Sequence, residues 1–231
     1  MNLDFSRYKL IFFDFDGVIV DTEWEHFAAF NDILSTYGIK ITKKEYMEEY
    51  LAYDDKGCFI KVFKNKLGKD LTKKEVQNLI KQKTELLMDK LKQKIKVYPD
   101  TIRFINFLSK KFKDIKLCIV SGALKQEILF ILKKLKLENK FFLIISAEDV
   151  KNGKPSPEPF LIAKQKVERL LNKKFNNNEI LVIEDSINGI KAAINAGFDV
   201  LSVAHTYPFK KLLEVNPNYV VKNLLEICNY K

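Results

Sequence analysis

The feature that most constrains the fold is a short apolar run, 10–13, that ends in the acidic turn Asp14-Phe15-Asp16-Gly17. The run shows none of the alternation that a half-exposed strand would have. Such a run is typical of a strand that is covered on both faces in a parallel sheet. Gly17 permits a tight turn directly after it. The sequence therefore predicts a buried strand that delivers two carboxylates to the edge of a parallel sheet.

Further strand candidates lie beyond residue 115 and alternate with helix-like segments. The strands are expected at 116–120, 141–145, 180–183 and 200–203, with a weaker sixth strand at 219–221. The helices between them are expected at about 101–112, 124–136, 157–172, 186–196 and 208–214. This alternation favours right-handed crossovers and a doubly wound parallel sheet. We therefore predict an α/β, Rossmann-like core.

The segment between the first and second predicted strands differs from the rest, because its pattern is helical throughout. Thr22 stands where it can cap a first helix, and Gly38 stands where that helix would end. Thr42 and Thr72 each begin a capping box, with a glutamate three residues further on. We therefore predict an all-helical cap domain that is inserted into the core. The predicted boundaries are 21–95 for the cap, with 1–20 and 96–231 forming the discontinuous α/β core.

The charge balance bears on the class of partner. A formal net charge of +10 at pH 7 would suit a nucleic acid. Yet only Arg7, Arg103 and Arg169 are arginines among 40 cationic residues. Arginine is the preferred side chain for contacting bases and phosphates in pairs, and the lysines are spread along the chain. We therefore expect no nucleic-acid partner, although a positive field would favour small anionic substrates.

The apolar residues and the cysteines bear on location. No stretch approaches the roughly 18 consecutive apolar residues that a membrane-spanning helix needs, so we expect no membrane partner. Cys58, Cys118 and Cys228 are scattered, without a spacing typical of metal binding, and indicate reduced thiols. The sequence thus predicts a cytoplasmic protein, which we expect to be a monomer.

Polar residues follow the predicted strands at the edge where ligands of parallel sheets collect. They are Asp14 and Asp16 after the first strand, Ser121 and Gly122 after the second, Lys154 in the loop after the third, and Glu184, Asp185 and Ser186 after the fourth. Each group alone is also consistent with turn or capping chemistry. Their joint order favours one shared site.

The chemistry of these residue types points to a metal and a phosphate. Carboxylates that meet at adjacent strand ends cannot all stay ionised without a cation. Oxygen ligands indicate a hard divalent metal, and Mg²⁺ is the expected one. A magnesium ion beside a lysine and small hydrogen-bond donors is typical of a site that handles phosphate. His205, after the fifth strand, is expected to be structural or exposed.

Four of these segments resemble the motifs of the haloacid dehalogenase superfamily. The matching segments are 14–22 (DFDGVIVDT), Ser121-Gly122, Lys154-Pro155 and 184–193 (EDSINGIKAA). The helical insert resembles the cap of the branch that contains β-phosphoglucomutase and phosphoglycolate phosphatase. The resemblance covers nearly the whole chain, and it implies a hydrolase that acts on a small phosphorylated metabolite.

The resemblance also implies a role for each matching residue. Asp14 would be the nucleophile that forms an aspartyl-phosphate, and Asp16 would be the general acid and base. Ser121 and the amide of Gly122 would bind the phosphoryl oxygens, and Lys154 would offset negative charge. Mg²⁺ would be held by Asp14, the Asp16 carbonyl and Asp185, with Glu184 either a further ligand or an acceptor behind the ligands.

The predicted cap bears on the choice between phosphatase and mutase. We expect Gly17, Gly122, Thr22, His26 and Lys56 to contact the substrate. The mutase has a threonine and a histidine at places that match Thr22 and His26, but it uses an arginine where this chain has Asp54, Asp55 and Lys56. The difference favours hydrolysis of a monophosphate over a β-phosphoglucomutase-like reaction.

Three functions from other classes account for part of this pattern. A signalling receiver domain also combines strand-end aspartates with a Lys-Pro pair, but it is about half this length and has no helical insert. A glycosyltransferase could use Asp14 and Asp16 to hold a metal–nucleotide sugar, yet Lys154 would then have no role. A catalytically inactive interaction protein would not need every residue type that the chemistry requires.

Overall fold

The computed structural model describes residues 3–51 and 53–227, so Cys228 lies outside the described residues. The chain divides into two compact units. One unit comprises Met1–Asp21 and Lys96–Lys231, and the other is Thr22–Ile95. We call them the α/β unit and the helical unit. Along the chain, the helical unit is inserted between the first and second strands of the α/β unit.

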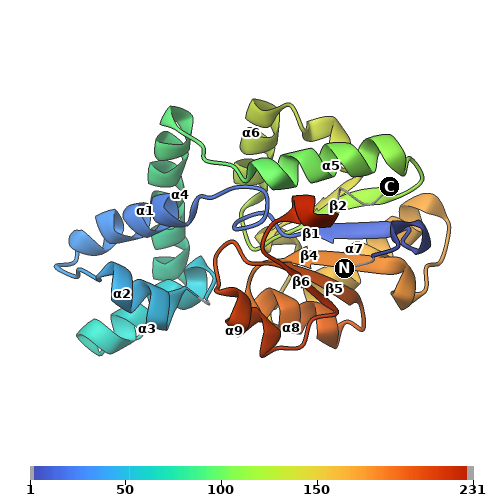
Figure 1. Ribbon diagram of the computed structural model, residues 1–231. Helices are drawn as coiled ribbons and strands as arrows, with labels where there is room; N and C mark the ends of the chain where they lie inside the picture. Colours follow the sequence, from blue (N-terminus) through green and yellow to red (C-terminus); the bar gives the residue numbers. More distant parts are fainter. Residues whose placement is uncertain (1–2, 52, 228–231) are drawn as a thin grey trace. The chain divides into compact units, whose positions relative to one another are not determined.

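Six parallel strands form one sheet in the α/β unit (Figure 1). They are β1 (Leu10–Phe13), β2 (Lys116–Val120), β3 (Leu143–Ile145), β4 (Ile180–Glu184), β5 (Asp199–Val203) and β6 (Tyr219–Val221). The strand order is β3-β2-β1-β4-β5-β6. The predicted doubly wound parallel sheet is confirmed, including the weak sixth strand, although β3 is shorter than expected.

Strand β1 is the one from which the site is built. It pairs with β2 on one side and with β4 on the other, and Phe13 is level with Ile119 and Ile183. The next residue of each strand path is therefore Asp14, Val120 or Glu184. The order of the strands thus brings the ends of β1, β2 and β4 to one edge of the sheet.

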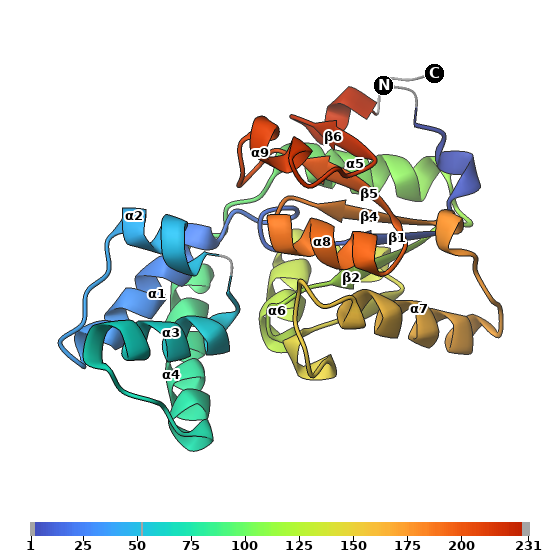
Figure 2. The same cartoon turned by 90° about the horizontal axis from the view of Figure 1, so that it is seen from below.

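Helices cover both faces of the sheet (Figure 2). The α/β unit contains α5 (Pro99–Lys111), α6 (Lys125–Leu135), α7 (Glu158–Leu171), α8 (Ile187–Asn195) and α9 (Phe209–Leu213). It also contains the short 3₁₀ segments η1 (Phe5–Arg7), η3 (Glu138–Lys140), η4 (Ala147–Asp149), η5 (Asn177–Glu179) and η6 (Leu224–Ile227). Successive side chains of a strand point to opposite faces. Phe13 of β1 contacts Phe104 of α5, whereas Phe12 stacks on Phe160 of α7.

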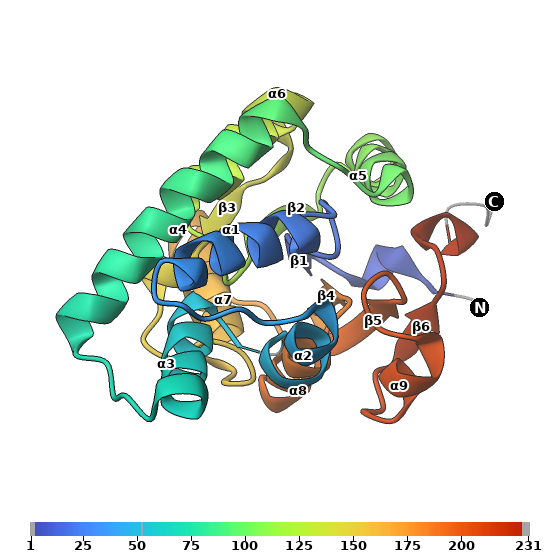
Figure 3. The ribbon, with the colours of Figure 1, turned by 90° about the vertical axis from the view of Figure 1, so that its left-hand side faces the viewer.

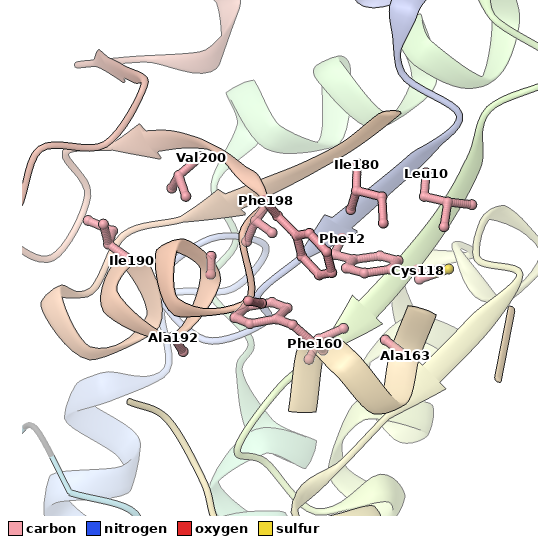
Figure 4. Close-up of a cluster of buried hydrophobic side chains, with 14 of the residues drawn as sticks. Leu10, Phe12, Cys118, Phe160, Ala163, Ile180, Ile190, Ala192, Phe198 and Val200 are labelled. Carbon is pink, nitrogen blue, oxygen red and sulfur yellow. The ribbon is translucent and has the colours of Figure 1, made fainter. Parts of the chain in front are cut away.

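One apolar cluster of the α/β unit lies between the sheet and the pair α7 and α8 (Figure 4). Leu10 and Phe12 of β1 meet Phe160 and Ala163 of α7 there, and each of these side chains is fully buried. Every residue of β1 is buried, which explains why its apolar run shows no alternation. The packing on both faces holds the end of β1 in a defined position.

The helical unit is built of helices (Figure 3), which pack around an apolar cluster of their own. Its elements are α1 (Glu23–Ser35), α2 (Lys43–Glu45), a π-helical turn η2 (Tyr46–Tyr50), α3 (Asp55–Leu67) and α4 (Lys73–Gln93). Helix α1 lies beside α4, and Phe30 of α1 contacts Phe59 of α3. Although α4 has 21 residues, no helix among the described residues is both long and apolar enough to cross a membrane.

The helix starts of this unit agree with the sequence in two cases and differ in one. Thr42 and Thr72 form the predicted capping boxes with Glu45 and Glu75. The prediction for Thr22 was wrong in part, because it precedes α1 but its side chain makes no capping hydrogen bond. Its backbone, at φ −111° and ψ 4°, lies outside the extended region that aims a capping oxygen at the helix amides.

Candidate active site

Asp14 directly follows β1 and is nearly buried. Its backbone amide donates to the carbonyl of Ile183 in β4 at 3.0 Å, which continues the sheet by one residue. Its carboxylate oxygen Oδ1 accepts a hydrogen bond from the Lys154 ammonium at 2.7 Å. The carboxylate therefore stands at the end of a central strand with a cation beside it.

Lys154 reaches this place from the loop between η4 and α7. Its Nζ donates to Asp14 Oδ1 at 2.7 Å, to Glu184 Oε1 at 2.7 Å and to the carbonyl of Val120 at 2.9 Å. Burial opposes the charged form of Lys154, but the carboxylates of Asp14 and Glu184 outweigh it and raise the pKa of its ammonium group. Lys154 thus links the ends of β1, β2 and β4.

Glu184, the last residue of β4, is fully buried. Its Oε1 accepts from Lys154, and its Oε2 accepts from the amides of Asp185 and Ser186 and from the Ser186 hydroxyl, at 2.9–3.0 Å. Both oxygens are therefore engaged by protein donors. We interpret Glu184 as the residue that positions Lys154 and the start of α8, rather than as a direct metal ligand.

Two glycines make room for the carboxylates. A Cβ atom at Gly189 would lie 1.7 Å from Glu184 Oε1, and one at Gly17 would lie 2.0 Å from Asp185 Oδ2. Gly17 also has a φ of +79°, a backbone conformation that residues other than glycine rarely adopt. Any other residue at either position would displace a carboxylate of the site.

The remaining charge fits a divalent cation. Asp14, Glu184 and Asp185 each place one carboxylate oxygen within 4.8 Å of the others, and all three residues are buried. Lys154 pairs with two of these carboxylates, those of Asp14 and Glu184. Burial raises the pKa of Asp14 to about 7, and Lys154 lowers it only in part. A further cation bound by Asp14 and Asp185 would keep these groups ionised at neutral pH.

Ser121 and Gly122 follow β2, the neighbour of β1. Ser121 is buried, and its Oγ accepts a hydrogen bond from the amide of Ala123 at 3.0 Å. Because this oxygen acts as an acceptor, its own hydrogen can be donated to a bound anion. A Cβ atom at Gly122 would meet nothing within 4 Å. The Gly122 residue therefore borders open space beside the end of β2.

Asp16 lies two residues beyond Asp14, in a tight turn that brings the chain back on itself. The carbonyl of Phe15 accepts from the amides of Ile19 and Val20, and the amide of Gly17 donates to the carbonyl of Val20 at 2.8 Å. Asp16 itself is half-buried. The turn therefore holds Asp16 close to the end of β1 while leaving its side chain partly accessible.

The three cap candidates lie in the helical unit. Thr22 is buried before α1, His26 is half-buried on α1, and Lys56 is exposed in the first turn of α3. The Nδ1 atom of His26 is 2.7 Å from the Nζ of Lys83. His26 is therefore held by a buried lysine, whereas Lys56 projects into solvent.

Sequence reasoning missed Lys83 and left open whether His205 is structural or exposed. Lys83 of α4 is fully buried and forms an ion pair with Asp55 at 2.9 Å. A signal existed, because Lys83 stands four residues from both Leu79 and Leu87 on the apolar stripe of α4. His205 is not exposed: its side chain is buried and its Nδ1 bonds to the carbonyl of Gly17 at 2.8 Å.

Comparison with known proteins identifies the family. The pattern of the haloacid dehalogenase-like hydrolases matches residues 11–203. The chain therefore belongs to this family of hydrolases. The match spans the sheet from β1 to β5 and includes every strand end from which the site is built.

Similar proteins cover almost the full chain. A phosphorylated carbohydrates phosphatase of Thermotoga maritima is 28% identical over 216 residues, which are 93% of this chain and 94% of that protein. A fructose-1-phosphate phosphatase of Escherichia coli is 24% identical over 199 residues, 86% of this chain and 98% of that protein. The crystal structure of CbbY from Rhodobacter sphaeroides in complex with phosphate shares the fold, with a TM-score of 0.80, 20% identity, and coverage of 95% and 96%.

Proposed function

We propose that this hydrolase is a Mg²⁺-dependent phosphatase of a small phosphate monoester, such as a sugar phosphate. The observation that carries the proposal is the contact of Asp14 with Lys154, at the end of the central strand and beside Asp185. A buried carboxylate held by a lysine suits nucleophilic attack on phosphorus. The names of the phosphatases similar to this chain support the substrate class.

The proposed reaction has two steps. A carboxylate oxygen of Asp14 attacks phosphorus, the bond from phosphorus to the ester oxygen breaks, and Asp16 gives its proton to the leaving alkoxide. Water then attacks the aspartyl-phosphate and passes a proton to Asp16. The bond from Asp14 to phosphorus breaks, which releases phosphate and regenerates both aspartates.

The other residues position and neutralise the phosphoryl group. Lys154 offsets the charge of Asp14, so that two anions can approach each other. The Ser121 hydroxyl and the Gly122 amide would donate hydrogen bonds to phosphoryl oxygens. Asp14, the Asp16 carbonyl and Asp185 would hold Mg²⁺. When bound, this ion supplies positive charge that stabilises the developing negative charge on phosphate oxygens.

The helical unit is proposed to select the substrate: Thr22, His26 and Lys56 would contact the part of the substrate beyond the phosphate. Gly17 and Gly122, in the α/β unit, would contact the phosphate itself. The segment before and within α3 supports a monophosphate. Asp54 caps α3 by accepting from the Gly57 amide, and Asp55 pairs with Lys83. Both acids are thus structural, and Lys56 is the cation left beside them. It lacks the planar fork with which arginine binds a second phosphate.

The cysteines bear on the compartment in which the protein works. The two cysteines within the described part of the chain, Cys58 and Cys118, are free and buried, which supports a reducing compartment. We therefore include a cytoplasmic monomer in the proposal. Size-exclusion chromatography with light scattering tests the monomer, because a monomer has a mass of 27.0 kDa and a dimer would have twice that mass.

The test is a phosphate-release assay. The purified protein is incubated with p-nitrophenyl phosphate and a panel of sugar phosphates, with MgCl₂ and with EDTA. We expect release with Mg²⁺, none with EDTA, and a loss of at least about 10³-fold in Asp14→Asn. Activity that persists in Asp14→Asn would remove Asp14 from the mechanism, and activity that ignores EDTA would remove the metal.

A second incubation separates hydrolysis from a mutase reaction. β-Glucose 1-phosphate is supplied with a trace of the glucose bisphosphate, and the products are followed by ³¹P NMR. Free phosphate as the main product supports the phosphatase. Glucose 6-phosphate as the main product would instead support a β-phosphoglucomutase-like enzyme.

A further inference from the structure

His205 stands two residues beyond β5 and is held on three sides. Its Nδ1 is 2.8 Å from the carbonyl oxygen of Gly17, and its Nε2 is 3.2 Å from Oδ2 of Asp100, at the start of α5. Its ring stacks on that of Tyr98, with centroids 3.8 Å apart and planes at 5°. The side chain is only 7% exposed. A buried polar side chain with this many partners has a defined orientation.

The partner of Nδ1 settles what this nitrogen does. A carbonyl oxygen only accepts, so the Nδ1 atom that faces Gly17 must carry a hydrogen. The Asp100 carboxylate also accepts from the amide of Leu224 at 2.9 Å. Although burial opposes it, the hydrogen bonds from His205 and Leu224 lower the pKa of Asp100. Asp100 is thus a fixed anion that anchors the imidazole ring of His205.

The bond to Gly17 matters because of where Gly17 stands. It directly follows Asp16, and its own amide donates to the carbonyl of Val20 at 2.8 Å. Its α-carbon lies against the carboxylate of Asp185, where no Cβ would fit. The carbonyl of Gly17 is therefore the point at which His205 can set the position of the turn that carries Asp16.

We propose that His205 is a positioning residue: through the carbonyl of Gly17 it holds the turn that places Asp16 for proton transfer, and Asp100 holds His205 in turn. This inference rests on the proposed function, because it assigns His205 a part in the protonation of the leaving group. The proposal assigns His205 no contact with the phosphate or with the carboxylates that would hold the metal. Its effect is transmitted by the backbone.

Such a role predicts a dependence on the leaving group. p-Nitrophenolate leaves readily without a proton, whereas phenolate needs more help from a general acid. The two phosphate esters are nearly the same size. The value of kcat/KM reports the steps through transfer to Asp14, in which the leaving group departs. A misplaced Asp16 should therefore slow phenyl phosphate more than p-nitrophenyl phosphate, whereas partial unfolding would slow both by the same factor.

Two substitutions test the roles of the two imidazole nitrogens separately. His205→Asn places a donor where Nδ1 was and can keep the bond to Gly17. His205→Gln places its amide nitrogen where Nε2 was and loses that bond. We expect His205→Gln to lower kcat/KM for phenyl phosphate by about tenfold, the effect of one lost positioning hydrogen bond. p-Nitrophenyl phosphate should lose less than about threefold, and His205→Asn should recover most of the loss.

The control is Ser202→Ala. Ser202 is buried in β5, three residues before His205, and its hydroxyl has no hydrogen-bond partner in the part of the chain that the structure describes. Its loss should leave both kcat/KM values unchanged. If His205→Gln does not fold, Asp100→Asn replaces it, because this change weakens the hold on the imidazole while the Leu224 amide keeps an acceptor. It should slow phenyl phosphate selectively, by a smaller factor.

A second measurement does not depend on activity. Hydrogen–deuterium exchange of the peptide 14–21 should quicken in His205→Gln and stay close to wild type in His205→Asn. Equal losses for both esters, or unchanged exchange in His205→Gln, would overturn the inference. If the wild-type protein hydrolyses neither ester but the exchange pattern is as expected, the proposed function fails. The structural part of the inference, that His205 holds the turn at Gly17, is then still supported.

Discussion

The two units each contain a buried lysine, and the surroundings of the two differ in charge. In the α/β unit, Lys154 lies between the carboxylates of Asp14 and Glu184. In the helical unit, Lys83 lies between one carboxylate, that of Asp55, and the ring nitrogen of His26. Both lysines are largely withdrawn from water, so each needs partners to remain charged.

The difference lies in the groups that surround each lysine. Lys83 forms an ion pair with Asp55, and the Nδ1 atom of His26 is a second partner of its ammonium group. In the α/β unit, Asp14, Glu184 and Asp185 form one buried cluster of carboxylates, and Lys154 pairs with two of them. A buried ion pair can link two helices, whereas a cluster of carboxylate oxygens suits a divalent cation. The clustering of carboxylates, rather than burial alone, therefore distinguishes the candidate active site from the helical unit.

The largest expected effect is on activity when Lys154 is replaced. Lys154→Met leaves Asp14 and Glu184 facing each other without the ammonium group between them. We expect kcat/KM for p-nitrophenyl phosphate to fall by about 10³-fold. Lys166→Met is the control, because Lys166 is in the same unit and pairs with Asp149 at 2.6 Å but is 42% exposed. Equal activity in the two variants would contradict the comparison.

Replacement of Lys83 should act on stability. Lys83→Met leaves the Asp55 carboxylate unpaired beside an apolar helix, and removing one partner of a buried pair costs about 3 kcal/mol. Denaturant unfolding, followed by circular dichroism, measures the loss. Adding Asp55→Asn should recover part of it, because the unpaired charge is then gone. A Lys83→Met variant as stable as the wild type would show that the pair contributes nothing.

Two glycines at the same helix position sharpen the comparison further. Gly189 in α8 and Gly57 in α3 each donate their amide to the capping side chain three residues earlier. An added Cβ at Gly189 would strike buried Glu184, whereas one at Gly57 would lie 2.9 Å from the ring of Tyr53, which is 47% exposed and can move.

We therefore expect a large effect from one alanine substitution and a small effect from the other. Gly189→Ala should lower kcat/KM by roughly 30-fold, because displaced Glu184 releases Lys154. Gly57→Ala should change the free energy of unfolding by less than about 1 kcal/mol, since alanine favours a helix. Steady-state kinetics and denaturant unfolding measure the two. A silent Gly189→Ala would mean that Glu184 has room that the structure does not show.

The smallest expected effect is a pH dependence. Burial opposes the charged form of Asp55, but Lys83 and His26 outweigh it and lower the pKa of the carboxyl below its ordinary value of 3.8. The folded state thus holds its proton less tightly than the unfolded state. The resulting stability is present above about pH 4 and is lost as the pH falls further. The difference in unfolding free energy between wild type and Asp55→Asn should therefore shrink below about pH 4.

Much of the α/β unit could be predicted because its signals are local. A run of apolar residues in 10–13 indicates a strand covered on both faces, and each later strand is marked in the same way. The acidic turn after that run and the lysine at position 154 could be placed at strand ends, since the carboxyl ends of parallel strands share one edge. These inferences need only the order of residues along the chain.

Other features depend on which segments meet in space. Glu184 could be predicted near the expected metal site, but only packing shows that its two oxygens accept from Lys154 and from the start of α8. His205 lies 188 residues from Gly17, and no local pattern relates the two. The same holds for Lys83 and Asp55, whose helices meet only through the packing of the helical unit.

The chain order by itself determined the sheet, the inserted helices and the residues at the strand ends, because periodicity and turn chemistry act over a few neighbouring residues. Only the tertiary structure decided which carboxylates gather in one buried cluster and which are held by the donors around them. Charge balance and hydrogen bonding in a buried site depend on atoms within a few ångströms, and those atoms come from segments far apart in the sequence.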